Sequence, residues 1–391
     1  MSHMDNWLLY LLIVAAIGIG WWLRGRERVK QPETVGPNYC NGLNYLLNEE
    51  PDRAVAAFIE ELEVNQDTLE THLALGGLLR RRGEIEKAVI VHENILSHAR
   101  LEKGAMLNVQ LELARDYLLA GLLDRAEELS ITISYEEGET RQAGRKVTLE
   151  VYEVEKEWEQ AIEVAQLLAV GIDSEKYEKA ISHYYCEIAS DCLAQKDFEC
   201  AREAIREAIG HNSHNARASL ILGQLDLAEG YYEEAISALM RIKDQEPVYV
   251  PESLEALTEA FGKSDLPQQQ FLDYLEACLE LTSSISIVLI LATSMRDEIG
   301  DEAMSKYIAN HLKHNPTIRG LTQLIDLHLD NTSGVAKQNL TILRSFAEAL
   351  VADKPAYRCH DCGFEGKKLF WHCPSCRDWA TIKPIFGLEG E

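Results

Sequence analysis

Apolar residues follow three different patterns along this 391-residue chain. The first is an uninterrupted run, WLLYLLIVAAIGIGWWL, which occupies residues 7–23 and contains no charged residue. The second is a helical periodicity that returns about every 34 residues through the middle of the chain. The third, near the carboxyl end, is a short aromatic stretch that contains four spaced cysteines. Each pattern predicts a different kind of structure.

The apolar run at 7–23 predicts a transmembrane helix. Seventeen helical residues span roughly 25 Å, slightly less than the ~30 Å hydrocarbon core of a bilayer. Basic residues follow the run at once, so the positive-inside rule places the chain from residue 24 onward in the cytoplasm and residues 1–6 in a short extracytoplasmic tail. The residues expected to contact lipid are the indoles at the ends of the run and the basic residues after it: Trp7, Trp21, Trp22, Arg24, Arg26, Arg28 and Lys30.

Two alternatives to an anchor are a cleaved signal peptide and a buried core helix. A signal peptide would place positive charge before the run and small residues at a cleavage site. Here the charge follows the run, and tryptophan and arginine occupy the region where cleavage would occur. Residues 24–37 then form a basic juxtamembrane linker, whose last part, QPETVGP, has the composition of a hinge.

The central periodicity, over residues 38–354, predicts an array of about nine helical pairs of the tetratricopeptide type. Close crossing of two antiparallel helices requires a small residue at the contact, and glycine or alanine on the first helix pairs with alanine on the second. The alanines expected on the second helices are Ala54, Ala88, Ala126, Ala161, Ala201, Ala235, Ala303 and Ala336. Gln269 occupies the corresponding position between Ala235 and Ala303. Pairs of this kind stack into a superhelix with a peptide- or protein-binding groove. A general α-solenoid remains the alternative.

Charge and chemistry in this region favour binding over catalysis. Residues 31–354 contain 29 basic and 57 acidic residues, so the array should repel nucleic acid and anionic lipid. The acidic surface either serves solubility or selects basic partner segments. We find no phosphate-binding loop and no nucleophile elbow, and the histidines show no ligand spacing with acidic partners. His211 and His214 are expected to be solvated or to cap helices.

Residues 355–391 predict a small metal-binding domain. Cys359 and Cys362 form one CxxC pair, and Cys373 and Cys376 form a second pair ten residues later. Two such knuckles make a tetrahedral four-sulfur site that suits iron or zinc. Two disulfides are the alternative. His360 and His372 adjoin ligands and could replace them, and Phe364, Phe370, Trp371 and Trp379 are expected to pack around the site or against the repeats. The formal charge of this domain is zero, which disfavours nucleic-acid binding.

The remaining five cysteines are expected to pack singly as small apolar side chains in a reducing compartment. They are Cys40, Cys186, Cys192, Cys200 and Cys278.

The CxxCG and CPxC pairs are similar to those of rubredoxin-type ribbons. The whole order of anchor, basic stop, repeats and a ribbon that ends in Ile382-Lys383-Pro384-Ile385 resembles the lipopolysaccharide assembly protein B family. That resemblance implies a bacterial inner-membrane regulator of lipopolysaccharide synthesis. It would act as an adaptor that brings the deacetylase LpxC to the FtsH protease for degradation, and it would contact an inner-membrane partner that senses lipopolysaccharide.

The expected molecule is therefore an all-α tetratricopeptide superhelix with an N-terminal transmembrane helix and a small C-terminal rubredoxin-like ribbon that binds a metal through four cysteines. We expect it not to be an enzyme. Two other functions stay open at this point. One is a membrane scaffold for lipopolysaccharide synthesis or transport proteins without a proteolytic role. The other is a rubredoxin-like redox protein.

Overall fold

The structure is a computed structural model, described for residues 45, 53, 68–98, 101–170, 173–330 and 332–391. The predicted anchor at 7–23, its basic linker and the first part of the repeats lie outside these residues. Within the described ranges, no helix combines the length and the apolar character that crossing a bilayer requires. The chain divides into two compact units, residues 1–147 and 148–391, and each is described by itself.

The first unit contains helices that pack in sequence order, α4 on α5, α5 on α6 and α6 on α7. Their bounds are α4 Leu69–Arg81, α5 Ile85–His98, α6 Lys103–Leu119 and α7 Leu123–Tyr135, and α8, Thr140–Glu155, begins in this unit. Gly83 and Gly121 adopt positive φ angles of 81° and 73° at the turns of the two helical pairs. Glycine has no Cβ to clash in this left-handed conformation, so the chain can reverse within a few residues.

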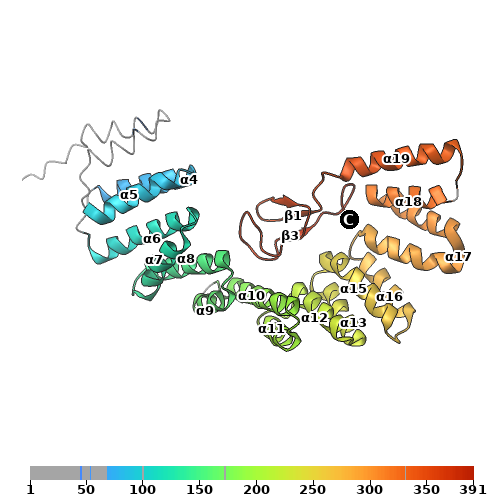
Figure 1. Ribbon diagram of the computed structural model, residues 1–391, viewed down its shortest axis with the longest axis horizontal. Helices are drawn as coiled ribbons and strands as arrows, with labels where there is room; N and C mark the ends of the chain where they lie inside the picture. The colour runs from blue at the N-terminus through green and yellow to red at the C-terminus, as the bar shows by residue number, and fades with distance from the viewer. Residues whose placement is uncertain (1–44, 46–52, 54–67, 99–100, 171–172, 331) are drawn as a thin grey trace, which may run out of the picture. The chain divides into compact units, whose positions relative to one another are not determined.

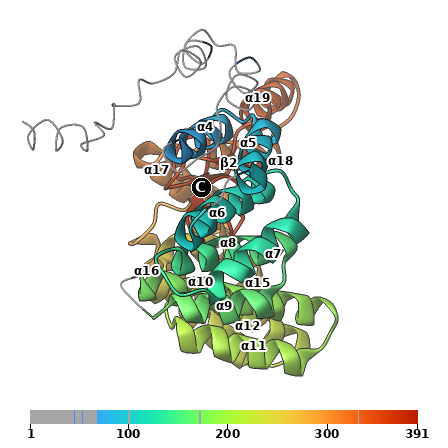
Figure 2. The same ribbon diagram turned by 90° about the vertical axis from the view of Figure 1, so that its left-hand side faces the viewer.

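The second unit continues the pattern of consecutive helices (Figure 1). Figure 2 shows α9, α10, α11 and α12 stacked on one another, as expected for repeated pairs. The helices are α9 Trp158–Leu168, α10 Ser174–Ala194, α11 Phe198–His211, α12 Ala216–Glu229, α13 Tyr232–Met240, α14 Ile242–Gln245, η1 Pro247–Tyr249, α15 Val250–Lys263, α16 Gln268–Leu279, α17 Ile285–His314, α18 Ile318–Asp330 and α19 Val335–Val351.

Small residues lie at the helix crossings, as the repeat pattern predicts. The alanines of five successive second helices are fully buried: Ala88, Ala126, Ala161, Ala201 and Ala235. On the first helices, a Cβ added to Gly76 would collide with the ring of His92, and one added to Gly223 would collide with Leu239. These glycines therefore let the two helices of a pair approach each other closely.

The predicted alanine pattern is wrong at its end. Ala336 is exposed at the start of α19, and the alanine that this helix buries is Ala347. Ala303 is only partly buried because it lies just after a break in α17. Gly300, with φ of 82°, divides α17 into two helices, and Ala292 before it shares a core with Met304 after it.

One disulfide corrects the prediction for the array cysteines. Cys186 and Cys278 are buried free thiols, as expected, but Cys192 and Cys200 are joined, with their Cα atoms 5.9 Å apart. Cys192 lies near the end of α10 and Cys200 near the start of α11. The short turn between these antiparallel helices places the two residues opposite each other, at a separation that a disulfide can span.

The C-terminal segment forms a three-stranded antiparallel sheet in the order β2-β1-β3. Its strands are β1 Tyr357–Cys359, β2 Glu365–Gly366 and β3 Ile382–Pro384. Arg358 faces Glu365 on one side and Lys383 on the other. The core of this ribbon is formed by Cys359, Cys373 and Ile382. So small a core cannot stabilise a fold alone, so the sheet depends on its cysteines and on the helices that it contacts.

Candidate metal centre

The two cysteine pairs lie in two knuckles of the same backbone design. The carbonyl of Cys359 accepts a hydrogen bond from the amide of Gly363, and the carbonyl of Cys373 accepts one from the amide of Arg377. Gly363 and Arg377 both have positive φ, at 77° and 58°. Each knuckle thus turns back directly after its second cysteine, which points both sulfurs of the pair to the same side.

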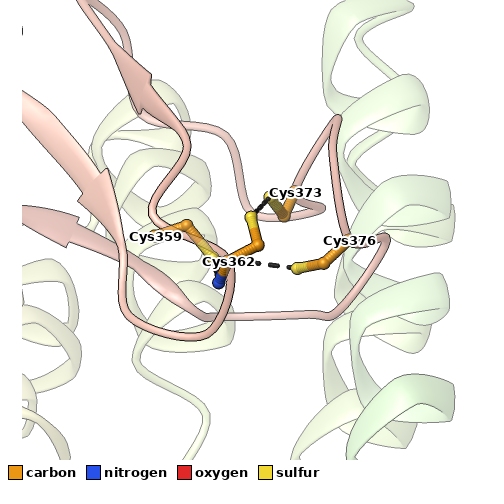
Figure 3. A group of neighbouring side chains, drawn as sticks. All are labelled: Cys359, Cys362, Cys373 and Cys376. Carbon is orange, nitrogen blue, oxygen red and sulfur yellow. Dashed lines mark hydrogen bonds between the residues drawn. The ribbon is translucent and has the colours of Figure 1, made fainter.

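The four sulfurs converge on one point between the knuckles (Figure 3). Cys359 Sγ lies 3.7 Å from Cys376 Sγ, and Cys362 Sγ lies 3.6 Å from Cys373 Sγ. All four are free of disulfides and lie within 4.8 Å of one another. Zinc–sulfur bonds of ~2.3 Å give a tetrahedron with edges of about 3.8 Å. The four cysteines therefore match a tetrahedral metal site, and the predicted ligands are brought together.

Hydrogen bonds to the sulfur of Cys359 favour its thiolate form. Burial opposes ionisation of Cys359, but the amide of Cys362, 3.5 Å from its sulfur, and the hydroxyl of Thr381, 3.3 Å away, outweigh it. Together with a further backbone contact they lower the pKa of Cys359 to about 6. The thiolate is the form that binds metal, so these contacts favour binding at neutral pH.

Neither adjacent histidine belongs to the ligand cluster. His372 Nε2 lies 2.8 Å from the carbonyl oxygen of Arg377, and its ring stacks on Trp379. His360 is exposed, and its backbone amide donates to the carbonyl of Thr381. His372 thus contacts the second knuckle, and His360 lies within the first knuckle and bonds to the strand region near Thr381. The four sulfurs fill the coordination sphere of a tetrahedral ion.

Trp379 joins the ribbon to α8, α9 and α10. Its indole N–H donates to Glu153 Oε1 at 3.1 Å, and the hydroxyl of Tyr184 donates to the same oxygen at 2.7 Å. The ring packs edge-on against Trp158 and Tyr184, with centroid distances of 6.1 and 5.6 Å. One carboxylate oxygen and two aromatic rings therefore fix this side of the ribbon.

Trp371 joins the ribbon to a second place on the repeats. Its ring lies 4.8 Å from that of Tyr249, and the guanidinium of Arg217 lies 5.9 Å from its centre. Tyr249 is fully buried, and its hydroxyl donates to the carbonyls of Ala380 and Ile382. The predicted packing of Trp371 and Trp379 against the repeats is confirmed. Phe364 packs against the ribbon core that contains Cys359 and Cys373, as predicted, and it also meets Phe370 edge-to-face.

Two further residues of the C-terminal segment, Tyr357 and Glu391, also contact the repeats. The hydroxyl of Tyr357 donates to Glu252 Oε1 at 2.8 Å. The carboxylate of Glu391 accepts hydrogen bonds from Ser284 Oγ and from the amide and hydroxyl of Ser286, at the start of α17. A carboxylate at a helix N-terminus meets unpaired N–H groups and a favourable dipole. The ribbon is therefore attached to the repeats at both of its ends and in its middle.

Sequence reasoning missed two histidines that have acidic partners. In the first unit, His92 Nδ1 lies 2.5 Å from Asp116 Oδ2, and Arg80 pairs with the other oxygen of Asp116. In the second unit, His211 Nδ1 lies 2.6 Å from Glu178 Oε2, so His211 is not merely solvated. His92 and Asp116 are 24 residues apart, whereas His211 and Glu178 are 33 residues apart, which is close to one repeat. His214 is exposed, as expected. The lipid-contacting residues predicted between Trp7 and Lys30 lie outside the described residues.

Comparison with protein-family models matches two parts of the chain. Residues 357–384 match a rubredoxin metal-binding domain, and residues 193–258 match a tetratricopeptide repeat. Among solved structures, a tetratricopeptide repeat protein from Parabacteroides merdae is similar over 67% of this chain and 98% of that one, with 12% identity and a TM-score of 0.35. The two family matches agree with a mostly helical repeat array followed by a cysteine ribbon.

Curated relatives match almost the whole chain. Lipopolysaccharide assembly protein B of Escherichia coli K12 is 36% identical over 392 residues, which cover 98% of this chain and 99% of the relative. The protein of the same name from Haemophilus influenzae is 28% identical over 396 residues, with the same coverage. At this identity and coverage, the chain belongs to the lipopolysaccharide assembly protein B family.

Proposed function

We propose that this protein is an inner-membrane adaptor that regulates lipopolysaccharide biosynthesis by bringing the deacetylase LpxC to the FtsH protease for degradation. Its relation to lipopolysaccharide assembly protein B supports a role in lipopolysaccharide assembly. Tetratricopeptide arrays bind other proteins, which supports action by binding and not by catalysis. The observation on which the proposal depends most is the attachment of the ribbon to the repeats through Trp371, Trp379 and Tyr249. That attachment joins two binding modules into one surface.

The mechanism that we propose is an increase in effective concentration. Residues 7–23 anchor the protein as a transmembrane helix, with residues 24–391 on the cytoplasmic side. A substrate held by the repeats beside a membrane protease meets that protease at a much higher local concentration than free substrate does. An inner-membrane partner that senses lipopolysaccharide would then control when the substrate is held.

The ion in this proposal is zinc, in a structural role. Four thiolates at tetrahedral spacing bind zinc without leaving a position for water or substrate. Bound zinc would hold the two knuckles together and keep Trp371 and Trp379 on the repeats. Elemental analysis of the purified protein tests this assignment. An iron content near one per chain, with the visible absorption of iron–thiolate, would favour the redox alternative.

The half-life of LpxC in growing cells tests the adaptor role. Deletion of residues 7–23, or the double change Cys359→Ser and Cys362→Ser, should lengthen that half-life, because the first removes the tether and the second removes the metal. Two controls should restore or keep normal turnover. One is replacement of 7–23 by an unrelated transmembrane helix. The other is Cys192→Ser with Cys200→Ser, which changes two cysteines outside the ribbon.

An unchanged LpxC half-life in both variants would contradict the adaptor role. If purification from membranes then recovers lipopolysaccharide synthesis or transport proteins bound to the wild-type chain, the scaffold alternative takes its place. Loss of these partners on removal of the metal would show that the ribbon serves that scaffold.

A further inference from the structure

The last helix of the repeat array, α19, exposes a row of large apolar side chains. The helix lies beside α18, and the chain then enters the ribbon (Figure 1). Its large apolar residues with at least half of their surface exposed are Val335, Ile342, Leu343, Phe346 and Leu350, at 71, 51, 54, 64 and 63%. We call these five residues the α19 stripe.

The α19 stripe is a second apolar face of this helix. At 3.6 residues per turn, its five positions fall within an arc of about 100°. The face that packs on the array lies on a different arc, with Ala347 buried and Leu340 and Val351 partly buried. A helix that only closes the array needs the packed face alone. The stripe is therefore additional apolar surface.

The position of the stripe, at the end of the array, makes it unusual. Stacked repeats bury their apolar faces against one another, so the terminal helix of a soluble array normally has a polar outer face. The five side chains of the α19 stripe instead leave roughly 500 Å² of apolar surface in solvent, as much as the large patches of monomers that often prove functional. The stripe thus has the character of a surface on which another helix packs.

The α19 stripe contains no charged side chain. The helical repeat places Lys337, Arg344 and Glu348 on the other side of α19. Arg344 Nε lies 2.8 Å from Asp326 Oδ1 of α18 and 3.3 Å from Glu348 Oε1. A strongly basic or acidic segment would find no opposite charge on the stripe. The surface that fits it is another uncharged apolar helix face.

The spacing of the stripe is nearly symmetrical about Leu343. Val335 lies eight residues before Leu343, and Leu350 lies seven residues after it. An antiparallel helix with the same sequence and the same centre would place Leu350 against Val335 and Leu343 against Leu343. The ring of Phe346 would lie near the short side chain of Asn339. A twofold contact of this kind uses the same surface on both molecules and closes after two copies.

We propose that the α19 stripe is the contact between two copies of this chain, paired antiparallel about a twofold axis near Leu343. Burial of the stripe on both copies gives an interface of about 1,000–1,200 Å², which reaches the lower limit for a specific interface. Each chain has a net charge of -26, but repulsion between exposed charges is screened beyond ~8 Å at physiological salt. The pairing does not depend on the proposed adaptor role.

Photo-cross-linking of the full-length protein in growing cells tests the pairing. Two copies with different tags are expressed together, and p-benzoyl-phenylalanine is introduced at position 343 of both. Irradiation should give a product of twice the single-chain mass that contains both tags. The control places the same photoprobe at position 337, which is exposed but lies on the other side of α19. There the product with both tags should be largely absent.

A lysine within the stripe should abolish the pairing. Phe346→Lys would bury an ammonium group between apolar side chains, so the yield of the position-343 product should fall about tenfold or more. The matched control is Leu281→Lys, because Leu281 is 58% exposed and lies outside α19. Both changes reduce the negative charge of the chain equally, so a difference between them reports the stripe. Leu350→Lys repeats the test at a second position, and far-ultraviolet circular dichroism checks that each variant is folded.

The dependence on salt distinguishes an apolar contact from ion pairs. The purified protein is reconstituted in phosphatidylcholine vesicles with the photoprobe at position 343. An increase of sodium chloride from about 0.1 to 0.5 M should raise the cross-linked fraction, because salt screens the repulsion between two acidic chains and leaves the apolar contact in place. Ion pairs would be weakened by the same change.

Four results would overturn the proposal. They are no product with both tags at position 343, a position-343 product that joins the chain only to a different protein, equal loss of product in Leu281→Lys and Phe346→Lys, and a lower cross-linked fraction at high salt. None of these measurements involves LpxC. Normal pairing together with an unchanged LpxC half-life in the anchor and cysteine variants would keep the α19 contact and reject the proposed adaptor role.

Discussion

At the scale of single residues, the two knuckles require the same left-handed backbone but use different residues for it. Gly363 has no Cβ, whereas Arg377 adopts φ of 58° with a full side chain. Gly363→Ala should therefore lower the unfolding free energy of the ribbon by about 1–2 kcal/mol. Arg377→Gly relieves backbone strain in the folded state but raises the conformational entropy of the unfolded chain. Because these two effects oppose each other, the unfolding free energy should change by no more than about 0.5 kcal/mol. Urea unfolding followed by tryptophan fluorescence measures both, and equal losses would contradict the assigned backbone roles.

His183 should make the stability of the second unit depend on pH. Burial lowers its folded-state pKa to about 3, below the ordinary value of 6.5. As the pH falls below 6.5, the unfolded chain therefore takes up a proton that the folded chain does not, and stability is lost progressively down to pH 3. The contribution lost between pH 7 and pH 5 is about 2 kcal/mol. Thermal unfolding of wild type and His183→Phe at both pH values should show a smaller acid loss in the variant. Identical acid losses would show that His183 can be protonated in the folded protein.

At the scale of helices, substitution of glycine by alanine tests where two helices pack closely. Gly223 lies against Leu239, so Gly223→Ala should lower the unfolding free energy by about 1–3 kcal/mol through overpacking. Gly210, within α11, has open space where its Cβ would lie. Gly210→Ala should raise stability by up to about 1 kcal/mol, because alanine is the better helix former. Thermal or urea unfolding compares the two, and a stabilising Gly223→Ala would mean that α12 and α13 can separate without cost.

The same scale explains what sequence could predict. The four ligands lie within eighteen residues and are related by local turns, so their spacing alone predicts the site. Small residues such as Ala201 and Gly223 recur because every pair repeats one crossing. In contrast, Trp379 and Glu153 are separated by 226 residues, and their meeting depends on how many pairs intervene and on the rotation between them. The same accumulated geometry places Asn212 and Trp371 on the wall of one cavity between the ribbon and the repeats, which no periodic pattern specifies.

At the scale of the whole second unit, the ribbon is too small to fold alone, and yet it supplies one wall of a cavity and covers aromatic residues of the repeats. Tyr184 and Tyr249 are fully buried, and Tyr249 hydrogen-bonds to the ribbon backbone. Burial raises the pKa of both phenols, because the ionised form would lose its hydration there. Loss of the ribbon would therefore expose aromatic surface on the repeats as well as unfold the sheet.

Removal of the metal should produce that change in a defined order. Structural zinc stabilises small domains by about 10–16 kcal/mol of apparent binding free energy, more than the contacts between ribbon and repeats are expected to replace. A strong chelator should therefore unfold 357–384 while the repeat helices persist, because their cores do not include the cysteine ligands.

Far-ultraviolet circular dichroism should change little, whereas limited proteolysis should cut after α19, between 351 and 357. Hydrogen exchange should rise around Tyr184 and Tyr249. Cys359→Ser with Cys362→Ser should reproduce this state, and Cys192→Ser with Cys200→Ser should not. A chelated protein that keeps slow exchange at Tyr249 would mean that the ribbon is held by its contacts with the repeats and not by the ion.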